Sequence, residues 1–305
     1  MAAPGDRLLA EAPTDGISSV SYSPVSADLL LASSWDTWVR IYDTGDKAGA
    51  PPPAPSAAPP PSPVVAKFGC EAPQLDAAWC GGGAVAAGGL DKAVRLFDVE
   101  SSRVRVLGAH GAAVRCVGWA AELGCVVSGG WDSTARLWDP RAPGGEALRM
   151  ATAHRVFAAA LAGTTLVVGT AERQLYFFDL RAGGAAAQRS RESSLKHQTR
   201  VLRAMPDGRG YIIGSIEGRC AVEYLADAEH AKAKYAFKCH RVADPATPGE
   251  DRIFPVNAIA FHPTHGSFAT GGGEGGVCIW DFKAKKRLAK LRECETSVSS
   301  LSFNW

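Results

Sequence analysis

Residues Ser34–Asp43 read SWDTWVRIYD and place a tryptophan beside the first of two aspartates that stand seven positions apart. The same arrangement returns as GWDSTARLWD at Gly130–Asp139. Apolar and polar residues alternate between the two aspartates, which is the pattern of a half-buried β-strand. The first aspartate therefore stands at a turn before a strand, and its return indicates an internal repeat.

The spacing of these acids defines the repeat. An acid followed by Asp seven residues later occurs at Asp36, Asp91, Asp132, Glu172 and Glu274, whereas Glu217 is followed by Tyr224. Successive first acids lie about 40 residues apart in the middle of the chain, and longer intervals elsewhere indicate insertions. A small-residue strand precedes each acid, an alternating strand follows it, and a further apolar strand lies upstream. Repeats of this length that end in Trp-Asp resemble those of all-β WD-repeat β-propellers, and the resemblance covers nearly the whole chain.

The repeat predicts one domain over residues 1–305 with seven blades. The first strands of the blades begin near Ile17, Leu75, Val114, Val156, Val201, Val256 and Val298. Because the chain stops at SVSSLSFNW, we expect the last blade to be incomplete, with Asp6–Ala12 as its closing strand. A sequence truncated there would leave strand edges open, so a chain extended by the missing strands should be more stable.

Composition excludes several classes of function. The 305 residues are 46% hydrophobic and 21% charged, and 33 Lys and Arg against 31 Asp and Glu give no overall basic footprint for nucleic acid. The eight cysteines are scattered without a C-x-x-C pair, so we expect neither a metal nor a cofactor nor disulfides. No apolar run is long enough to cross a membrane, and no secretory signal opens the chain. We therefore expect an intracellular protein.

The third repeat contains residues that suggest two different roles. In WD repeats, the first acid joins a hydrogen-bonded tetrad with a histidine, a serine or threonine, and a tryptophan, which here are Asp132, His110, Ser128 and Trp138. Ser, His and Asp could also form a hydrolase triad. We favour the structural tetrad because the repeat context explains it and no Gly-x-Ser-x-Gly elbow is present.

The Pro-rich stretch at residues 48–63 lies between the third and fourth strands of the first blade. Its composition cannot build a core, so we interpret it as a passive linker. A ligand for an aromatic groove is the alternative.

Several phrases resemble a narrower family. RESSLKHQTR at Arg191–Arg200, GSIEGRCAVEYL at Gly214–Leu225 and KYAFKCHR at Lys234–Arg241, together with SSWDT and SGGWDSTARLWDPR, are similar to the spindle-checkpoint WD-repeat proteins of the Bub family. The related messenger-RNA export WD-repeat proteins of the nuclear pore share some of these phrases, and HPTHGSFAT resembles theirs.

The Bub resemblance implies an adaptor without enzymatic activity. It would bind a short peptide motif of checkpoint kinases and phosphorylated Met-Glu-Leu-Thr repeats of the kinetochore scaffold, with the anaphase-promoting complex as a further partner. The implied location is the nucleus, the kinetochore in mitosis, and also the cytoplasm. The alternative is an export adaptor at the nuclear pore.

Propeller geometry predicts where such partners bind, because turns between second and third strands share a face with loops between blades. For the peptide we predict Trp35, Trp131, Arg200 and Glu217 on that face, and for the phosphate Arg219, Lys238, His240 and Arg241. The alternatives are that the tryptophans only cover their own blades and that the cations form a solvated rim.

An enzyme would instead need an acid and a base that converge in the axial channel. The first strands offer small or apolar residues there, namely Ser18, Ser19, Val20, Val114, Cys116, Ala158, Ala160, Asn257 and Ile259. We therefore predict an interaction scaffold.

Overall fold

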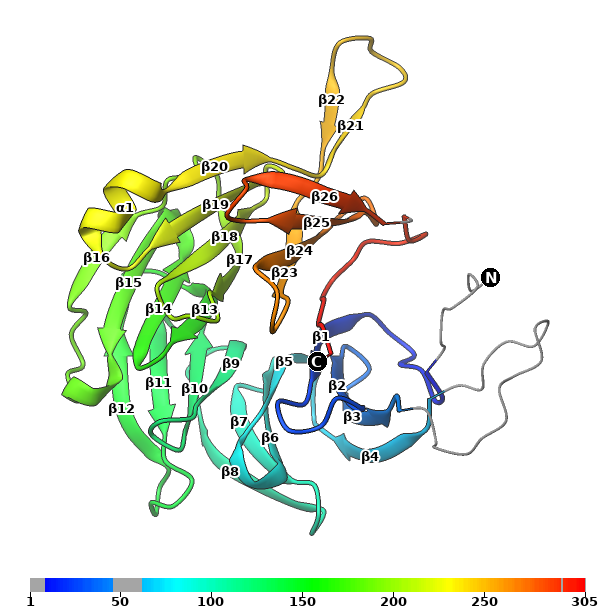
Figure 1. Ribbon diagram of the computed structural model, residues 1–305. Helices are drawn as coiled ribbons and strands as arrows, with labels where there is room; N and C mark the ends of the chain where they lie inside the picture. The colour runs from blue at the N-terminus through cyan, green and yellow to red at the C-terminus, as the bar shows by residue number, and fades with distance from the viewer. Residues whose placement is uncertain (1–8, 46–61, 292, 305) are drawn as a thin grey trace.

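The computed structural model describes residues 9–45, 62–291 and 293–304, whose strands form six four-stranded antiparallel sheets around an axis (Figure 1). The first three sheets are β1 (Ile17–Tyr22), β2 (Leu29–Ser34), β3 (Trp38–Asp43) and β4 (Val64–Gly69); β5 (Gln74–Trp79), β6 (Ala84–Gly89), β7 (Ala93–Asp98) and β8 (Arg103–Ala109); and β9 (Val114–Ala120), β10 (Cys125–Gly130), β11 (Thr134–Trp138) and β12 (Glu146–Ala151). The next three are β13 (Val156–Ala162), β14 (Thr165–Thr170), β15 (Gln174–Asp179) and β16 (Arg189–Glu192); β17 (Thr199–Ala204), β18 (Gly210–Ser215), β19 (Arg219–Tyr224) and β20 (Tyr235–Lys238); and β23 (Val256–Phe261), β24 (Ser267–Gly272), β25 (Val277–Asp281) and β26 (Lys286–Lys290). Each sheet is one blade of a WD-repeat propeller.

Short elements interrupt the blades. The helix α1 (Asp227–Ala233) lies between β19 and β20, and a hairpin of β21 (Arg241–Ala243) and β22 (Asp251–Ile253) lies between the fifth and sixth blades. Three single-turn 3₁₀ segments are η1 (Gly81–Gly83), η2 (Ala171–Arg173) and η3 (Leu180–Ala182). None of the helices in the described ranges is long and apolar enough to span a membrane.

Small residues on the second strands let neighbouring blades approach closely. A Cβ on Gly88 would lie 2.4 Å from Cγ1 of Val114 in the next blade, and a Cβ on Gly129 would lie 2.6 Å from Cγ1 of Val156. Such distances are far inside van der Waals contact, so each position needs glycine for this approach. The small-residue motif before each acid is therefore a packing signal.

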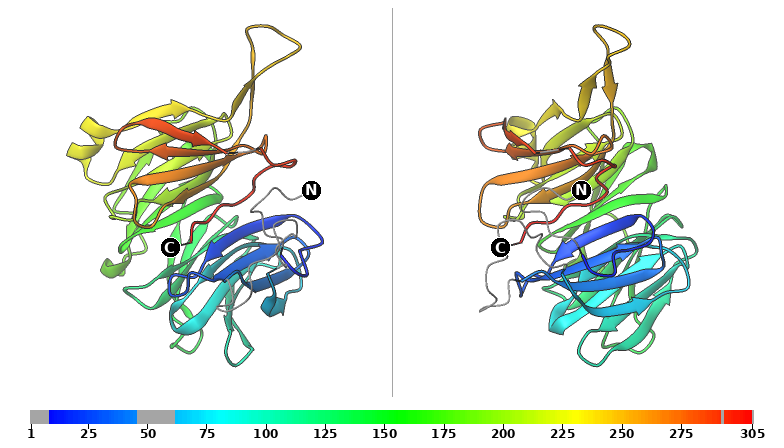
Figure 2. Two further views of the ribbon diagram at one scale, coloured as in Figure 1. Left: turned by 45° about the vertical axis from the view of Figure 1, so that its right-hand side comes forward. Right: turned by 90° about the vertical axis from the view of Figure 1, so that its right-hand side faces the viewer.

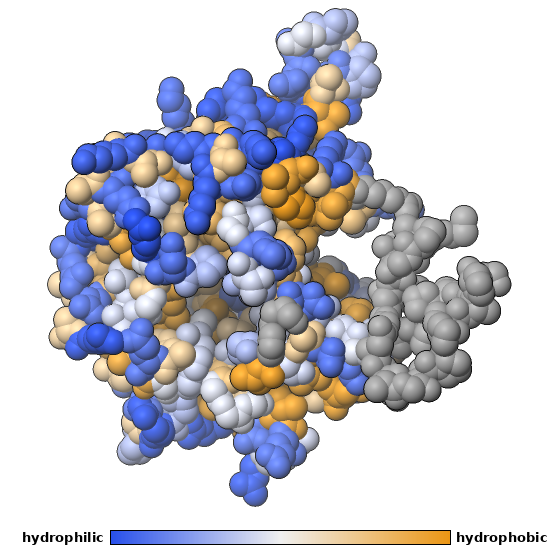
Figure 3. Space-filling view, viewed as in Figure 1, coloured by the Kyte–Doolittle hydropathy of each residue, from blue (hydrophilic) through white to orange (hydrophobic). Residues whose placement is uncertain are grey.

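The apolar core is distributed along the contacts between blades. Adjacent first strands contact one another from β1 through β5, β9, β13 and β17 to β23, and a cluster of buried side chains fills each gap between sheets. Tyr42, Phe97, Trp138, Phe177 and Phe268 are fully buried. Hydrophilic residues prevail on the outer strands, as Figure 3 shows along the rim.

The prediction of seven blades is only partly right, because the described residues form six. Residues 293–304 carry no strand, since no second strand within the described ranges pairs with them. This segment still lies between the sixth and first blades: Val298 N–H donates to the Gly272 carbonyl at 3.1 Å, and Val20 N–H donates to Ser300 Oγ at 3.0 Å.

The predicted closing strand is also different. Residues 6–8 lie outside the described residues, and Leu9 forms an isolated parallel bridge with Ser62, beside the first blade. Of the Pro-rich stretch, residues 48–61 likewise lie outside the described residues. The Pro-rich stretch lies in the connection between β3 and β4, as the repeat predicted.

Candidate peptide-binding face

The first acid of a repeat organises the turn between the second and third strands. Asp36 accepts the backbone N–H of Trp38 at 3.2 Å and that of Thr14 at 3.0 Å, and it pairs with Arg40 at 2.8 Å. Asp132 repeats this pattern with Thr134 N–H, Gly111 N–H and Arg136. Asp91 likewise pairs with Arg95. The acid therefore ties a turn to the strand after it and, in the first and third blades, to a preceding loop.

In the third blade, four side chains form one hydrogen-bonded chain. Trp138 Nε1–H donates to Ser128 Oγ at 2.7 Å, and Ser128 Oγ lies 2.7 Å from His110 Nε2. His110 Nδ1 lies 3.0 Å from Asp132 Oδ1. Each of these hydrogen bonds has one donor and one acceptor if the Ser128 hydroxyl donates to His110 Nε2 and the imidazole carries its proton on Nδ1.

Burial and hydrogen bonds determine the protonation states of His110 and Asp132 in this tetrad. Burial lowers the pKa of His110, although the neighbouring Asp132 opposes the shift, so the imidazole is neutral at pH 7. Partial burial acts to raise the pKa of Asp132, but hydrogen bonds from His110, Gly111 and Thr134 outweigh it and lower that pKa well below the usual value. Ser128 is 1% exposed, so its hydroxyl is closed to an outside substrate.

The sixth blade contains a second chain of the same kind, and it corrects one prediction. His240 Nδ1 lies 2.6 Å from Glu274 Oε1, and its Nε2 lies 2.8 Å from Thr270 Oγ1, which also accepts from Trp280. His240 is 5% exposed. The assignment of His240 to a phosphate site is wrong, because both ring nitrogens are engaged inside the blade.

Apolar side chains occupy the equivalent position in several turns. Trp35 and Trp131 donate their backbone N–H groups to Gly16 and Ala113, just before the first strands of their blades, each at 2.9 Å. Ile216 makes the same contact with Gln198. Trp35 is 45% exposed and Ile216 is 43% exposed. Sequence reasoning missed Ile216 because it searched this position for aromatic residues.

Trp131 is less exposed than Trp35, and its indole N–H is buried without a hydrogen-bond partner in the described part of the chain. A buried, unpaired donor costs free energy. Trp131 therefore presents a partly exposed apolar surface, whereas its buried indole N–H is closed to an outside partner in this conformation.

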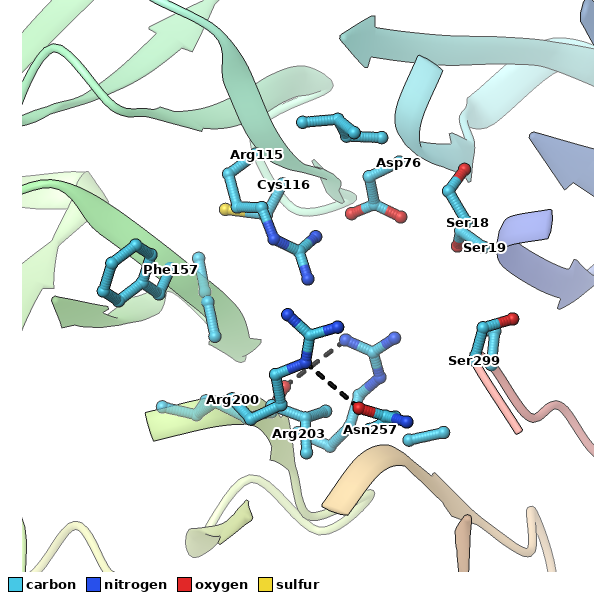
Figure 4. A pocket seen from close by; sticks show the side chains of 17 residues that line it. Ser18, Ser19, Asp76, Arg115, Cys116, Phe157, Arg200, Arg203, Asn257 and Ser299 are labelled. Carbon is cyan, nitrogen blue, oxygen red and sulfur yellow. Dashed lines mark hydrogen bonds between the residues drawn. The ribbon is translucent and has the colours of Figure 1, made fainter. Parts of the chain in front are cut away.

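The hollow at the start of the first strands is basic, which corrects the prediction of a small, apolar channel. Figure 4 shows Arg115, Arg200 and Arg203 converging there from β9 and β17. The hollow is open to solvent. The strand pattern did not reveal Arg115 and Arg203, because it does not fix which side chains reach the axis.

Arg200 belongs to this hollow, not to a loop as expected. Its Nε donates to Asn257 Oδ1 at 3.1 Å. Partial enclosure, together with the nearby charge of Arg115, lowers the pKa of Arg200. Within the described ranges, no ion pair joins Arg115, Arg200 or Arg203 to a carboxylate; Asp76 also lines the hollow, and it accepts the backbone N–H of Val117.

A second basic cluster lies at the outer end of the fifth blade. Arg219 on β19 stands directly opposite Lys238 on β20, so both side chains share one face of the sheet. Glu217 lies within 3.4 Å of Arg219 Nε, Arg241 Nη2 and His197 Nε2. The structure therefore brings Arg219, Lys238 and Arg241 together and adds His197. We call these four residues the rim cluster.

The described residues contain no group of three His, Cys, Asp or Glu side chains that could hold a metal ion. All eight cysteines are free thiols. Cys220 and Cys239 lie 3.7 Å apart at Sγ and are buried, and burial raises the pKa of Cys220.

Comparison with known proteins shows which proteins this chain is similar to. The model of the WD domain, G-beta repeat, matches residues 7–43, 101–139 and 249–281. "Mitotic checkpoint protein BUB3.1" of Arabidopsis thaliana is 41% identical over 303 residues, which cover 98% of this chain and 83% of the plant protein. "Mitotic checkpoint protein bub-3" of Caenorhabditis elegans is 40% identical over 100% of this chain and 85% of its own length. "Poly(A)+ RNA export protein" of Schizosaccharomyces pombe is 34% identical over 98% and 81%.

Proposed function

The chain belongs to the Bub3 family of WD-repeat proteins, and from that premise we propose that it is an adaptor of the spindle assembly checkpoint. It binds an acidic, partly apolar peptide motif of checkpoint kinases over the basic hollow. It binds a phosphothreonine of the kinetochore scaffold at the rim cluster. The adaptor acts in the nucleus and at kinetochores in mitosis.

The observation that carries the proposal is the set of three arginines in the hollow, which have no acidic partner among the described residues. Guanidinium groups that face one another repel, and a peptide carboxylate would relieve this repulsion through charge-assisted hydrogen bonds. Trp35 and Trp131 supply the apolar contact area that dominates most peptide interfaces. Acidic and apolar side chains in one short segment are therefore the matching ligand.

The peptide site is tested by fluorescence anisotropy with a labelled kinase-motif peptide. Arg200→Glu should weaken binding roughly 30-fold or more, because it removes one cation and adds a like charge beside the peptide acids. Trp35→Ala and Trp131→Ala should each weaken it by a similar factor. Arg103→Glu, on the exposed outer strand β8, is the matched control and should leave affinity unchanged. Equal affinity of Arg200→Glu and Arg103→Glu would refute the peptide site.

The rim cluster supports a phosphate site by its geometry. Arg219 and Lys238 are paired across β19 and β20, and the Lys238 side chain has no partner within the described part of the chain. A phosphothreonine carries about −1.5 to −2 charges at pH 7 and three acceptor oxygens, so it should bind far better than threonine. His240 takes no part, because it is buried in its tetrad.

Matched Met-Glu-Leu-Thr peptides with and without phosphate test this site at two salt concentrations. Wild type should prefer the phosphorylated form, and salt should reduce that preference. Arg219→Glu and Lys238→Glu should abolish it, whereas Lys286→Glu on the exposed strand β26 should not. Equal binding of both peptides by wild type would reduce the rim cluster to an ordinary solvated surface.

An export adaptor is the second candidate, because relatives named "Poly(A)+ RNA export protein" and "mRNA export factor GLE2" align with the same length of chain. Affinity purification from mitotic and interphase cells separates the two. Checkpoint kinases and the kinetochore scaffold in the mitotic sample support the checkpoint role, and nucleoporins in interphase support export.

A further inference from the structure

Three Ser/Thr-Pro dipeptides occur in the chain, and the structure distinguishes among them. They are Ser23-Pro24, Ser62-Pro63 and Thr247-Pro248. Ser23 is 1% exposed and Ser62 is 2% exposed, whereas Thr247 is exposed. An enzyme that recognises a hydroxyl followed by proline therefore reaches only Thr247 in the folded protein.

Thr247 stands at the tip of the β21–β22 hairpin, which projects from the ring of blades in each view (Figures 1 and 2). Only three residue pairs join the two strands, and all their side chains except Arg241 are exposed. A two-stranded hairpin of this kind is marginally stable by itself. The tip can therefore open locally into the extended conformation that a kinase binds, at little cost to the blades.

The tip also leaves the acceptor hydroxyl free. Two backbone hydrogen bonds hold the loop. Thr247 N–H donates to the Asp244 carbonyl at 3.3 Å, and Glu250 N–H donates to the Thr247 carbonyl at 3.1 Å. The Thr247 hydroxyl forms no hydrogen bond with any described residue. The loop is thus shaped by its backbone, and the side chain that would react points to no internal partner.

We propose that Thr247 is a phosphorylation site for a proline-directed serine/threonine kinase. The Thr247 Oγ1 attacks the γ-phosphorus of ATP, the bond from that phosphorus to the β-γ bridging oxygen breaks, and ADP leaves. The hydroxyl proton passes to the kinase base. The product places about −1.5 to −2 charges beside Asp244, Glu250 and Asp251.

One cation of the hairpin stands near Thr247 in the sequence. Arg252 Nε already pairs with Asp244 Oδ1 at 3.0 Å and is the cation nearest in sequence to the new phosphate. Because the tip projects from the ring, the phosphate is displayed to a partner with convergent Arg and Lys side chains. The site is separate from the basic hollow, and its hairpin begins at Arg241 of the rim cluster.

The test treats the folded full-length chain with a proline-directed kinase, Mg²⁺ and ATP, and locates phosphate by peptide mass spectrometry. A tryptic digest of the same chain, in which all three dipeptides are accessible, reports kinase activity. We expect one phosphate on the folded protein, at Thr247, with a rate roughly tenfold or more above that of Ser23 and Ser62.

Two variants sharpen the result. Thr247→Ala and Pro248→Ala should both remove the phosphate, whereas Thr264→Ala should not, because Thr264 is equally exposed but follows a proline instead of preceding one. The proposal is overturned if the folded chain stays unmodified while the digest reacts. It is also overturned if Ser23 or Ser62 reacts as fast as Thr247 in the folded chain.

Discussion

At the scale of single residues, the acid and the tryptophan of one turn differ in what they contact. Asp132 is a hydrogen-bond acceptor for its turn and for His110, while Trp131 beside it has a buried indole N–H without a partner among the described residues. The acid of the Trp-Asp motif therefore holds the turn, and the tryptophan beside it leaves part of its side chain exposed.

The tetrad should make stability depend on pH. The pKa of Asp132 is lowered in the folded state, so folding favours its charged form, and that stabilisation is present above the unfolded pKa of about 3.9 and lost as pH falls below it. Asp132→Asn should lower the free energy of unfolding at pH 7 by about 1–3 kcal/mol and should show a smaller loss between pH 5 and 3. Urea unfolding at several pH values measures both. Asp251→Asn, on the exposed hairpin, is the control, and an identical acid profile for wild type and Asp132→Asn would contradict the prediction.

Glu217 should weaken phosphate binding in the wild-type protein. Its carboxylate lies 3.4 Å from Arg219 and from Arg241, so it competes with a phosphate for these cations and repels it. Glu217→Gln keeps the shape, removes the charge, and should tighten binding of the phosphorylated peptide about three- to tenfold. Anisotropy titrations measure this, with Glu250→Gln as the control. Weaker binding by Glu217→Gln would show instead that the carboxylate orients the arginines.

At the scale of strands, the repeat follows from packing. A Cβ on Gly88 or Gly129 would meet a valine of the following first strand at 2.4 or 2.6 Å, and a Cβ on Gly271 would meet Val298 of the C-terminal segment at 2.5 Å. Residue patterns of period two predicted the first strands of the six blades, whereas the first strand that they predicted at Val298 does not form.

A methyl group at this contact should cost stability. Gly129→Ala would place a Cβ 2.6 Å from Val156 Cγ1 and 2.7 Å from Cys116 Sγ, so we expect a loss of about 1–3 kcal/mol. Val156→Ala should be destabilising by itself but should recover part of the loss in the double variant. Gly184→Ala, which has no neighbour within 4 Å, should behave like wild type in thermal unfolding. Additive effects of Gly129→Ala and Val156→Ala would show that the two residues do not press on each other.

The residues of the candidate site were harder to predict than the strands. The exposed Trp35 and the paired Arg219 and Lys238 could be placed because they lie next to repeat signals. His240 was misplaced because the hairpin insertion separates it from its blade by more residues than separate His110 from Asp132. Arg115 and Arg203 were missed because their exposure depends on the curvature of the ring, which no local pattern encodes.

At the scale of the whole molecule, the residues after β26 connect the sixth and first blades. Val298 packs on Ala269 and Val277, and a Cβ on Gly271 would lie 2.5 Å from its Cγ1. This is the contact that valines of first strands make elsewhere in the ring. Val298 thus occupies the position of a first strand without being part of a sheet.

If this segment closes the ring, shortening Val298 should destabilise the entire propeller. Val298 is 9% exposed, and Val298→Ala leaves a gap against Gly271, so we expect a loss of about 1–2 kcal/mol in the free energy of unfolding. Val156→Ala, at the equivalent contact between the third and fourth blades, sets the scale, and Val25→Ala, at 80% exposure, should have no effect. Urea unfolding followed by tryptophan fluorescence reports all three. A Val298→Ala midpoint equal to that of Val25→Ala would mean that the blades hold the ring together without this segment, because its apolar contact would then contribute nothing to the folded state.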